Sequence, residues 1–260
     1  MKNNKIIVIK IGGSIIDNNI YIKNIIGNVR ELFLKNFKII IVHGGSKQID
    51  REMIRHKIKI KKIDGKRYTD LKTIKILDKC CKQINDRIVN LMKKHKINVT
   101  GLHSKYNTLM YANKLQNVGN LGYVGYISRI KKLEFLKLLK DNIVVISPLI
   151  PDERKKLYNV NADDVAQAIS TFLKVDRLIF ISDIDGVKYK NRIIKKLKVS
   201  NLKQIFKKDI VSGGMIAKLN ACIKAIKKGV RNIHIVNGKY CDIILKIIFN
   251  KYKPGTTIQL

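Results

Sequence analysis

Hydrophobic and polar positions along this chain follow two different periods. Short runs of β-branched and other apolar residues recur, and such runs indicate buried strands. They occupy residues 5–11, 38–42, 97–102, 143–147, 178–182 and 232–236. Between them, apolar residues return at helical spacing over residues 46–58, 70–95, 131–140, 163–174 and 215–228. This alternation predicts the α/β class: a three-layer αβα sandwich, with helices on both faces of a mostly parallel sheet.

Three segments add detail to this pattern. In the 70–95 stretch the apolar stripe predicts a helix that packs in the core or forms part of a subunit interface. The glycine-rich residues 103–130 predict hairpins, and 120–125 would be either a lid over a site or a plain surface hairpin. The lysine-rich residues 186–200 would form either a hairpin near a nucleotide or a solvated excursion.

Composition narrows the class of protein. A chain of 260 residues with 45% apolar residues forms one large α/β domain or two lobes that share a sheet. The formal charge of +35 suggests nucleic-acid binding at first sight. However, the lysines are spread over the whole chain together with an excess of Ile and Asn, and no arginine-rich arm is present. We therefore interpret the charge as the codon bias of an A/T-rich genome and expect no specific nucleic-acid partner.

Cysteine spacing and hydropathy indicate the compartment. Cys80, Cys81, Cys222 and Cys241 show no C-x-x-C spacing and predict reduced, mostly buried thiols and no metal site. The first apolar run is interrupted by Lys10, and no stretch is long enough to span a bilayer. We expect a cytoplasmic protein with no membrane partner.

Glycine pairs carry the strongest chemical signal. Gly12-Gly13 and Gly44-Gly45 each follow a predicted strand and precede a helix. Glycine lets the backbone approach an anion closely, and helix N-terminal amides face that anion. Lys10 lies in the first apolar strand, where an ammonium group is costly to bury without an anion; the alternative is that it reaches solvent at the strand end.

Other polar residues could complete such a site. Arg67 can bind a carboxylate through two parallel hydrogen bonds, although a solvated loop arginine is equally compatible with the local sequence. The polar residues 159–164 exceed what one helix cap requires, so a carboxylate here could hold two lysines while an asparagine contacts substrate. Lys218 lies in the first turns of a helix after a third glycine pair, which suits a phosphate group.

Six motifs in this order resemble those of the amino-acid kinase family, and within it the branch that phosphorylates N-acetyl-L-glutamate. They are K-I-G-G (10–13), V-H-G-G (42–45), K-R-Y-T-D (66–70), N-V-N-A-D (159–163), S-D-I-D-G-V (182–187) and G-G-M-I-A-K (213–218). The resemblance covers residues 10 to about 255, nearly the whole chain. It implies the fold of that family, and a homodimer in which residues 1–174 bind the acyl amino acid and residues 175–260 bind ATP.

The resemblance also implies a role for each motif. Lys10 and Lys218 would stabilise the phosphoryl group in flight, and Asp163 would organise both lysines. Substrate would be bound by Gly44, Gly45, Arg67 and Asn159. The nucleotide site would be lined by Gly12, Gly13, Ser182, Asp183, Ile184, Asp185, Gly186, Val187, Ile210, Val211 and Ser212. ATP would carry Mg²⁺ on its phosphates, and its γ-phosphoryl group would pass to the γ-carboxylate of N-acetyl-L-glutamate in arginine biosynthesis.

Two rival functions remain at this stage. A related kinase could act on aminoadipate or glutamate held on a carrier protein in lysine biosynthesis. A non-catalytic scaffold that binds nucleic acid is a more distant alternative, because Lys10, Asp163 and Lys218 are all present. Arginine-inhibited family members carry an extra N-terminal helix that links dimers into a hexamer. Because the first strand begins near residue 5, we expect a simple dimer without arginine feedback.

Overall fold

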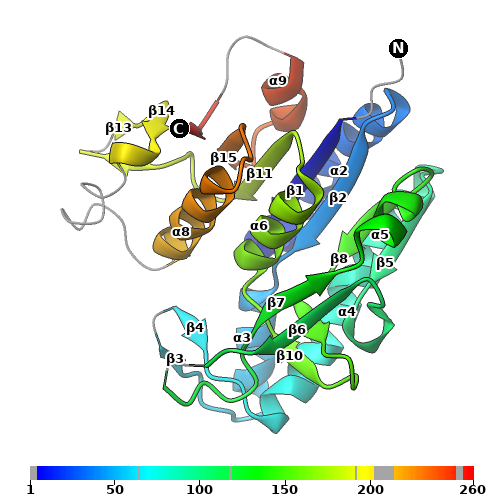
Figure 1. Ribbon diagram of the computed structural model, residues 1–260, viewed down its shortest axis with the longest axis vertical. Helices are drawn as coiled ribbons and strands as arrows, with labels where there is room; N and C mark the ends of the chain where they lie inside the picture. The colour runs from blue at the N-terminus through cyan, green and yellow to red at the C-terminus, as the bar shows by residue number, and fades with distance from the viewer. Residues whose placement is uncertain (1–4, 64, 117–118, 191, 202–213, 250–253) are drawn as a thin grey trace.

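An eight-stranded sheet runs through the molecule (Figure 1). The computed structural model describes residues 5–63, 65–116, 119–190, 192–201, 214–249 and 254–260. The strand order is β14 (Lys196–Lys198), β16 (Thr256–Gln259), β15 (Ile233–Asn237), β11 (Arg177–Ser182), β1 (Ile6–Ile11), β2 (Lys38–His43), β8 (Ile143–Ile146) and β5 (Val99–Leu102). Among the described strands of this sheet, only the pairing of β15 with β16 is antiparallel, so the prediction of a mostly parallel sheet is confirmed.

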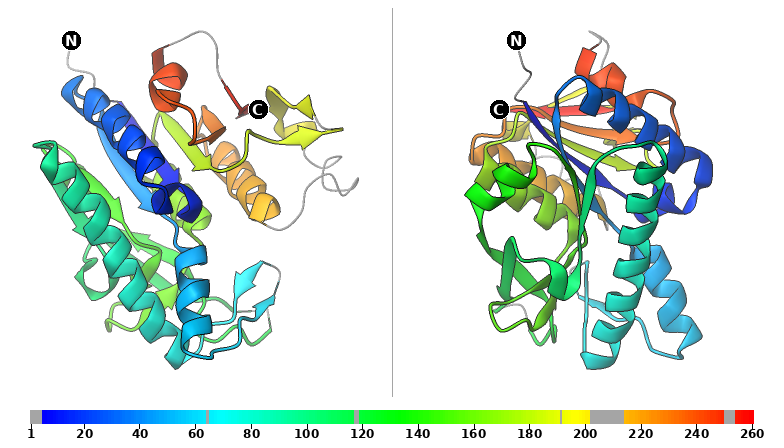
Figure 2. Two further views of the ribbon diagram at one scale, coloured as in Figure 1. Left: turned by 180° about the vertical axis from the view of Figure 1, so that it is seen from behind. Right: turned by 90° about the vertical axis from the view of Figure 1, so that its right-hand side faces the viewer.

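Helices cover both faces of this sheet, as Figures 1 and 2 show from opposite sides. One face packs against α2 (Asn19–Leu34), α4 (Leu71–Lys94) and α9 (Ile243–Phe249). The other packs against α5 (Lys132–Leu138), α6 (Ala162–Leu173) and α8 (Gly214–Lys227). The predicted three-layer sandwich is therefore confirmed.

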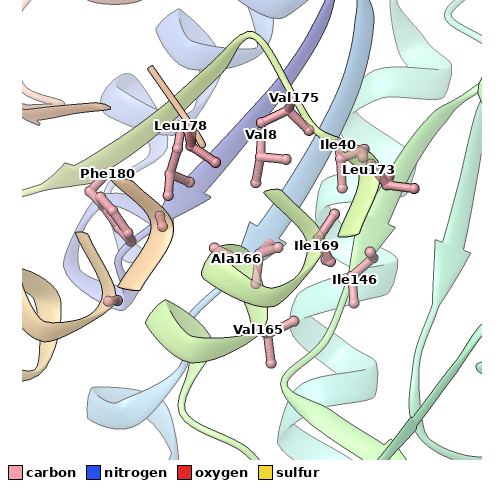
Figure 3. Close-up of a cluster of buried hydrophobic side chains, with 14 of the residues drawn as sticks. Val8, Ile40, Ile146, Val165, Ala166, Ile169, Leu173, Val175, Leu178 and Phe180 are labelled. Carbon is pink, nitrogen blue, oxygen red and sulfur yellow. The ribbon is translucent and has the colours of Figure 1, made fainter. Parts of the chain in front are cut away.

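Side chains of β1 alternate between the two faces of the sheet, so this one strand contributes to the cores on both sides. Ile7 and Ile9 belong to the core beneath α2, whereas Val8 belongs to the core beneath α6. Figure 3 shows the second core, where Val8 from the sheet lies opposite Ala166 and Ile169 on α6. Successive side chains of a strand point to opposite faces, so a continuous apolar run is what a doubly covered strand requires.

Short hairpins project from the carboxyl edge of the sheet. They pair β3 (Lys62–Ile63) with β4 (Lys66–Arg67), β6 (Met110–Lys114) with β7 (Gly125–Ile130), β9 (Leu149–Pro151) with β10 (Leu157–Asn159), and β12 (Lys188–Tyr189) with β13 (Arg192–Ile193). A single 3₁₀ turn, Ser104–Tyr106, precedes β6. The hairpin predicted within 103–130 is confirmed, and residues 186–200 form a hairpin followed by the edge strand β14.

Most predicted elements lie where the pattern placed them, but several elements of the structure were not predicted. The five predicted helices correspond to α3 (Ser46–Arg55), α4, α5, α6 and α8, and the six predicted strands to β1, β2, β5, β8, β11 and β15. No prediction covered α2, α9 or β16. Isoleucine is the most frequent residue in α2, and β-branched residues favour strands by their own conformational preference. The helical conformation of α2 therefore depends on its packing against the sheet.

The burial of the cysteine side chains agrees with the prediction from the sequence. Cys80, Cys81 and Cys222 are buried, while Cys241 is exposed, and all four are free thiols. Among the described helices, none combines the length and the apolar character needed to cross a membrane.

Candidate active site

The glycine turns meet at the carboxyl edge of the sheet. Parallel strands end at the same edge, and ligands of open α/β sheets bind there. The Gly44 amide donates a hydrogen bond to the carbonyl of Ile11 at 2.8 Å, and the Gly12 amide donates to the carbonyl of Ile181 at 2.8 Å. The turns after β1, β2 and β11 therefore lie side by side. The structure thus brings together turns that were predicted separately from the sequence.

Close packing at this edge requires glycine. A Cβ atom on Gly44 would lie 3.3 Å from the carbonyl oxygen of Ile11 and 3.4 Å from the amide nitrogen of Gly13. A Cβ atom on Gly12 would lie 3.3 Å from the carbonyl oxygen of Ile181. Side chains here would push the turns apart, so the glycines allow the three turns to pack directly against one another.

Three charged side chains from distant segments meet beside these turns. Lys10 Nζ lies 2.9 Å from Asp163 Oδ1, and Lys218 Nζ lies 3.2 Å from Asp163 Oδ2. Lys10 comes from β1, Asp163 from the first turn of α6 and Lys218 from α8. The predicted grouping of these three residues is present in the structure. We call Lys10, Asp163 and Lys218 the lysine triad.

Neighbouring groups hold the lysine triad in place. The side chain of Asn161 caps α6 and accepts a hydrogen bond from the Asp163 amide at 2.8 Å. The Lys218 ammonium lies 4.9 Å from the centre of the Phe180 ring, within cation–π range. Phe180 is also the register partner of Lys10 on the neighbouring strand. The triad is therefore built into the core rather than displayed on a mobile surface.

Burial and charge compete in the titration of this triad. Burial alone would raise the pKa of Asp163, but the ammonium groups of Lys10 and Lys218 outweigh it and lower that pKa to about 2. Burial lowers the pKa of Lys218, and the Asp163 carboxylate only partly opposes this change. Two ammonium groups paired with one carboxylate give the triad one net positive charge. That charge can attract one additional anion to the edge of the sheet.

His43 at the end of β2 is a packed histidine. Its ring is fully buried, and Nδ1 lies 3.1 Å from the carbonyl oxygen of Gly44. Burial lowers its pKa to about 4, so the ring is neutral at physiological pH. We therefore assign it a packing role.

Arg67 lies on β4, and its guanidinium is buried. Nη2 makes an ion pair with Asp50 Oδ1 on α3, and Nη1 lies 3.1 Å from the sulfur of Met53. Asp50 also lies 3.5 Å from Lys62 Nζ. Arg67 is thus not the solvated loop arginine that the sequence left open. We call Arg67, Asp50 and Lys62 the arginine triad.

Asn159 is joined to the segment that carries Arg67. Its side-chain amide donates to Thr69 Oγ1 at 3.0 Å, and Thr69 Oγ1 donates to the Arg67 carbonyl at 2.8 Å. The segment 120–125 completes this connection, because the Tyr123 amide donates to the Thr69 carbonyl and the Asn159 amide donates to the Tyr123 carbonyl. These residues are tied to the site by backbone hydrogen bonds. A role as a lid stays a prediction.

The predicted nucleotide turn follows β11. Asp185 accepts hydrogen bonds from Asn237 and Tyr240, and Asp183 pairs with Lys47 at 3.5 Å. Gly186 has φ +139°, and a Cβ there would lie 2.7 Å from Thr256 Oγ1, so this position needs glycine. Ser182, Ile184 and Val187 belong to the same strand and turn. The predicted residues Ile210, Val211 and Ser212 lie outside the described residues.

Several residues of this edge were not predicted from the sequence. Asp50, Thr69, Lys47 and Asn237 all contact predicted site residues. Asn237 could have been found, because it ends the strand 233–237 at the same edge as the other strand ends. Asp50 lies on α3 one helical turn before Met53, the second neighbour of Arg67, but only the fold shows that this face meets β4.

Comparison with known proteins gives one consistent result. The profile described as "Amino acid kinase family" matches residues 5–237. "Acetylglutamate kinase" of Campylobacter hominis is 36% identical over 258 residues, which cover 98% of this chain and 91% of that protein. "Acetylglutamate kinase" of Archaeoglobus fulgidus is 32% identical over 267 residues, which cover 97% and 92% of the two chains.

A solved structure with the same fold is N-acetylglutamate synthase from Neisseria gonorrhoeae complexed with coenzyme A and N-acetyl-glutamate. It superposes with a TM-score of 0.91 over 100% of this chain and 60% of that chain, at 16% identity. At this identity the likeness shows the fold alone.

Proposed function

Since the chain belongs to the amino acid kinase family, we propose that it is an acetylglutamate kinase, which transfers the γ-phosphoryl group of ATP to the γ-carboxylate of N-acetyl-L-glutamate. The product is an acyl phosphate, N-acetyl-L-glutamyl 5-phosphate, in arginine biosynthesis. The observation that carries this proposal is the lysine triad, two ammonium groups fixed on one buried carboxylate beside the turns that follow β1, β2 and β11. Full-length similarity to curated acetylglutamate kinases supports the choice of acceptor.

The lysine triad supplies charge rather than proton transfer. In phosphoryl transfer a carboxylate oxygen attacks phosphorus, the bond to ADP breaks, and negative charge spreads over the oxygens of the phosphoryl group in flight. Lys10 and Lys218 stabilise that charge from fixed positions, and Asp163 keeps them oriented. The γ-carboxylate needs no general base, because a glutamate side chain with a pKa of about 4.3 is already ionised. Catalysis is therefore positioning plus electrostatics.

The substrate lies on the side of the lysine triad that carries β2, α3 and β4. The amides of Gly44 and Gly45 bind the acyl amino acid, Arg67 takes one of its carboxylates, and Asn159 contacts it from β10. Support comes from the hydrogen-bonded connection between Asn159, Thr69 and Arg67 and from the position of Gly45 as the N-cap of α3. Residues 1–174 form this substrate lobe.

ATP lies on the side that carries β11 and α8, in a lobe formed by residues 175–260. Gly12 and Gly13 face its phosphates, and the turn from Ser182 to Val187 contacts the nucleotide. The centre offers ammonium groups and amides, which fit phosphate oxygens, whereas both oxygens of Asp163 are occupied by lysines. We therefore assign Mg²⁺ to the nucleotide phosphates and to no protein carboxylate. The protein acts as a cytoplasmic homodimer.

The experiment that tests this function measures ADP release from Mg-ATP in the presence of hydroxylamine, which traps acyl phosphates as hydroxamates. N-acetyl-L-glutamate is compared with free glutamate, aspartate and UMP. Turnover and hydroxamate only with N-acetyl-L-glutamate are the expected result. Silence with all four acceptors would contradict the proposal and would favour a carrier-bound acceptor or a non-catalytic scaffold.

A further inference from the structure

The buried guanidinium of Arg67 is held from one direction only. Its Nη2 is paired with Asp50, while Nη1 faces the sulfur of Met53, which is a weak acceptor. Both neighbours lie on α3, three residues apart, so they form one face of that helix. Nothing in the described part of the chain accepts a hydrogen bond from Arg67 Nε. One edge of the guanidinium is anchored, and the remaining donors are left for another acceptor.

The charge of the arginine triad also leaves room for one anion. Arg67 and Lys62 carry two positive charges against the single carboxylate of Asp50. A guanidinium presents five donors in a planar fork, so it can bind a protein carboxylate and a substrate carboxylate at the same time. An anchored guanidinium loses less side-chain freedom when a substrate binds than a free arginine would.

We propose that Asp50 is a positioning residue, which fixes the Arg67 guanidinium so that its remaining donors meet a carboxylate of the acyl amino acid. This inference rests on the proposed function, because it assumes that Arg67 binds that substrate. Asp50 does not touch the substrate. It acts through Arg67, and the phosphoryl-transfer step does not depend on it.

The test is steady-state kinetics of Asp50 variants with Mg-ATP and N-acetyl-L-glutamate. Asp50→Ala removes the anchor and should raise the KM for N-acetyl-L-glutamate about ten- to a hundred-fold, the range of one charge-assisted hydrogen bond. kcat and the KM for ATP should stay within about twofold of wild type. Asp50→Asn keeps an oxygen that can accept from Nη2, so it should recover most of the wild-type KM.

A matched control is available on the same helix. Glu52 is a carboxylate of nearly equal exposure that pairs with Arg55 and His56, away from Arg67. Glu52→Ala should leave every kinetic constant unchanged. In the double variant with Arg67→Ala, the Asp50→Ala change should add less than about twofold to the KM, because the residue through which it acts is gone.

The outcomes separate the two proposals. An inactive wild-type enzyme would overturn the proposed function. An active wild type with an unchanged KM in Asp50→Ala, or with equal Asp50→Ala effects in the presence and absence of Arg67, would overturn only the role of Asp50. A KM below that of wild type would show that Asp50 competes with substrate for Arg67, which also contradicts positioning. If Asp50→Ala does not fold, Asp50→Glu replaces it, and its displaced carboxylate should raise the same KM.

Discussion

Two carboxylates in this molecule each lie between two cations, yet their surroundings differ. In the lysine triad the side chain of Asp163 is 8% exposed, and those of Lys10 and Lys218 are 12% and 7% exposed. In the arginine triad Arg67 is equally buried, but Asp50 is 26% and Lys62 46% exposed. Both triads carry one net positive charge.

The difference in burial indicates a division of labour. Charges interact more strongly where water is excluded, and fixed charges need no reorganisation during a reaction. The lysine triad is therefore suited to stabilise a short-lived charge distribution. In the arginine triad water reaches Asp50 and Lys62 but not Arg67, so the charges of these two residues are screened more strongly, which suits reversible binding of a carboxylate. The predictions below test whether this division is correct.

Loss of Lys218 should have the largest effect. Lys218→Ala removes one of the two ammonium groups on the phosphoryl group in flight, so kcat should fall by about a thousandfold or more while the fold is retained. Lys227→Ala, an exposed lysine on the same helix, serves as the control and should leave kcat unchanged. Turnover by Lys218→Ala at the wild-type rate would remove the catalytic role from the lysine triad.

The next largest difference between the two triads is expected in the free energy of unfolding. Asp163→Asn leaves two buried ammonium groups without their carboxylate and should lower the free energy of unfolding by about 3 kcal/mol. Asp50→Asn affects a pair open to solvent and should lower it by about 1 kcal/mol or less. Urea unfolding followed by circular dichroism measures both. Equal losses in the two variants would show that burial does not distinguish the triads.

Arg67→Ala should change binding rather than chemistry. Loss of the charge-assisted hydrogen bonds should raise the KM for N-acetyl-L-glutamate about ten- to a hundred-fold, with kcat little changed. Arg55→Ala, an exposed arginine on neighbouring α3, is the control. If Arg67→Ala instead weakened ATP binding and spared the acyl amino acid, the two subsites would be assigned the wrong way round.

The sequence predicted the lysine triad better than the arginine triad. Lys10, Asp163 and Lys218 each stand in a motif with a glycine pair or a helix cap, so their chemistry was visible although Asp163 lies 153 positions and Lys218 208 positions after Lys10 in the chain. Asp50 has no such mark, because it is one of several charged residues on an exposed helix. Its role depends on the contact between β4 and α3, and the local hydrophobic pattern of the sequence does not predict this tertiary contact.

A similar limit applies to the elements that were missed. α2 contains several residues whose own preference is for strands, and its helical conformation depends on an apolar face buried against β1 and β2. β16 is a short antiparallel strand added to a parallel sheet, and its position follows from pairing with β15 rather than from its own pattern. Sequence period thus predicts a strand best where both of its faces are buried, and it misses elements whose conformation is decided by tertiary contacts.

The smallest but most specific difference between the two triads is expected in the pH dependence of kcat and of the KM for N-acetyl-L-glutamate. Burial lowers the pKa of Lys218, and the ammonium form is the one that stabilises the phosphoryl group. As pH rises, kcat should therefore begin to fall below the pH at which an exposed lysine titrates. The guanidinium of an arginine stays protonated through this range, so the KM for N-acetyl-L-glutamate should remain flat.

Measurement of kcat and KM from neutral pH upward tests this split between the triads. In Lys218→Arg the positive charge persists at high pH, because arginine does not titrate in this range. The variant should have a lower kcat than wild type, and this kcat should no longer fall as the pH rises. A decline with an unchanged midpoint in that variant would assign the titration to another residue. A parallel rise in the KM of the wild type would mean that the binding site loses charge together with the catalytic centre, and the two triads would then act as one electrostatic unit rather than as two.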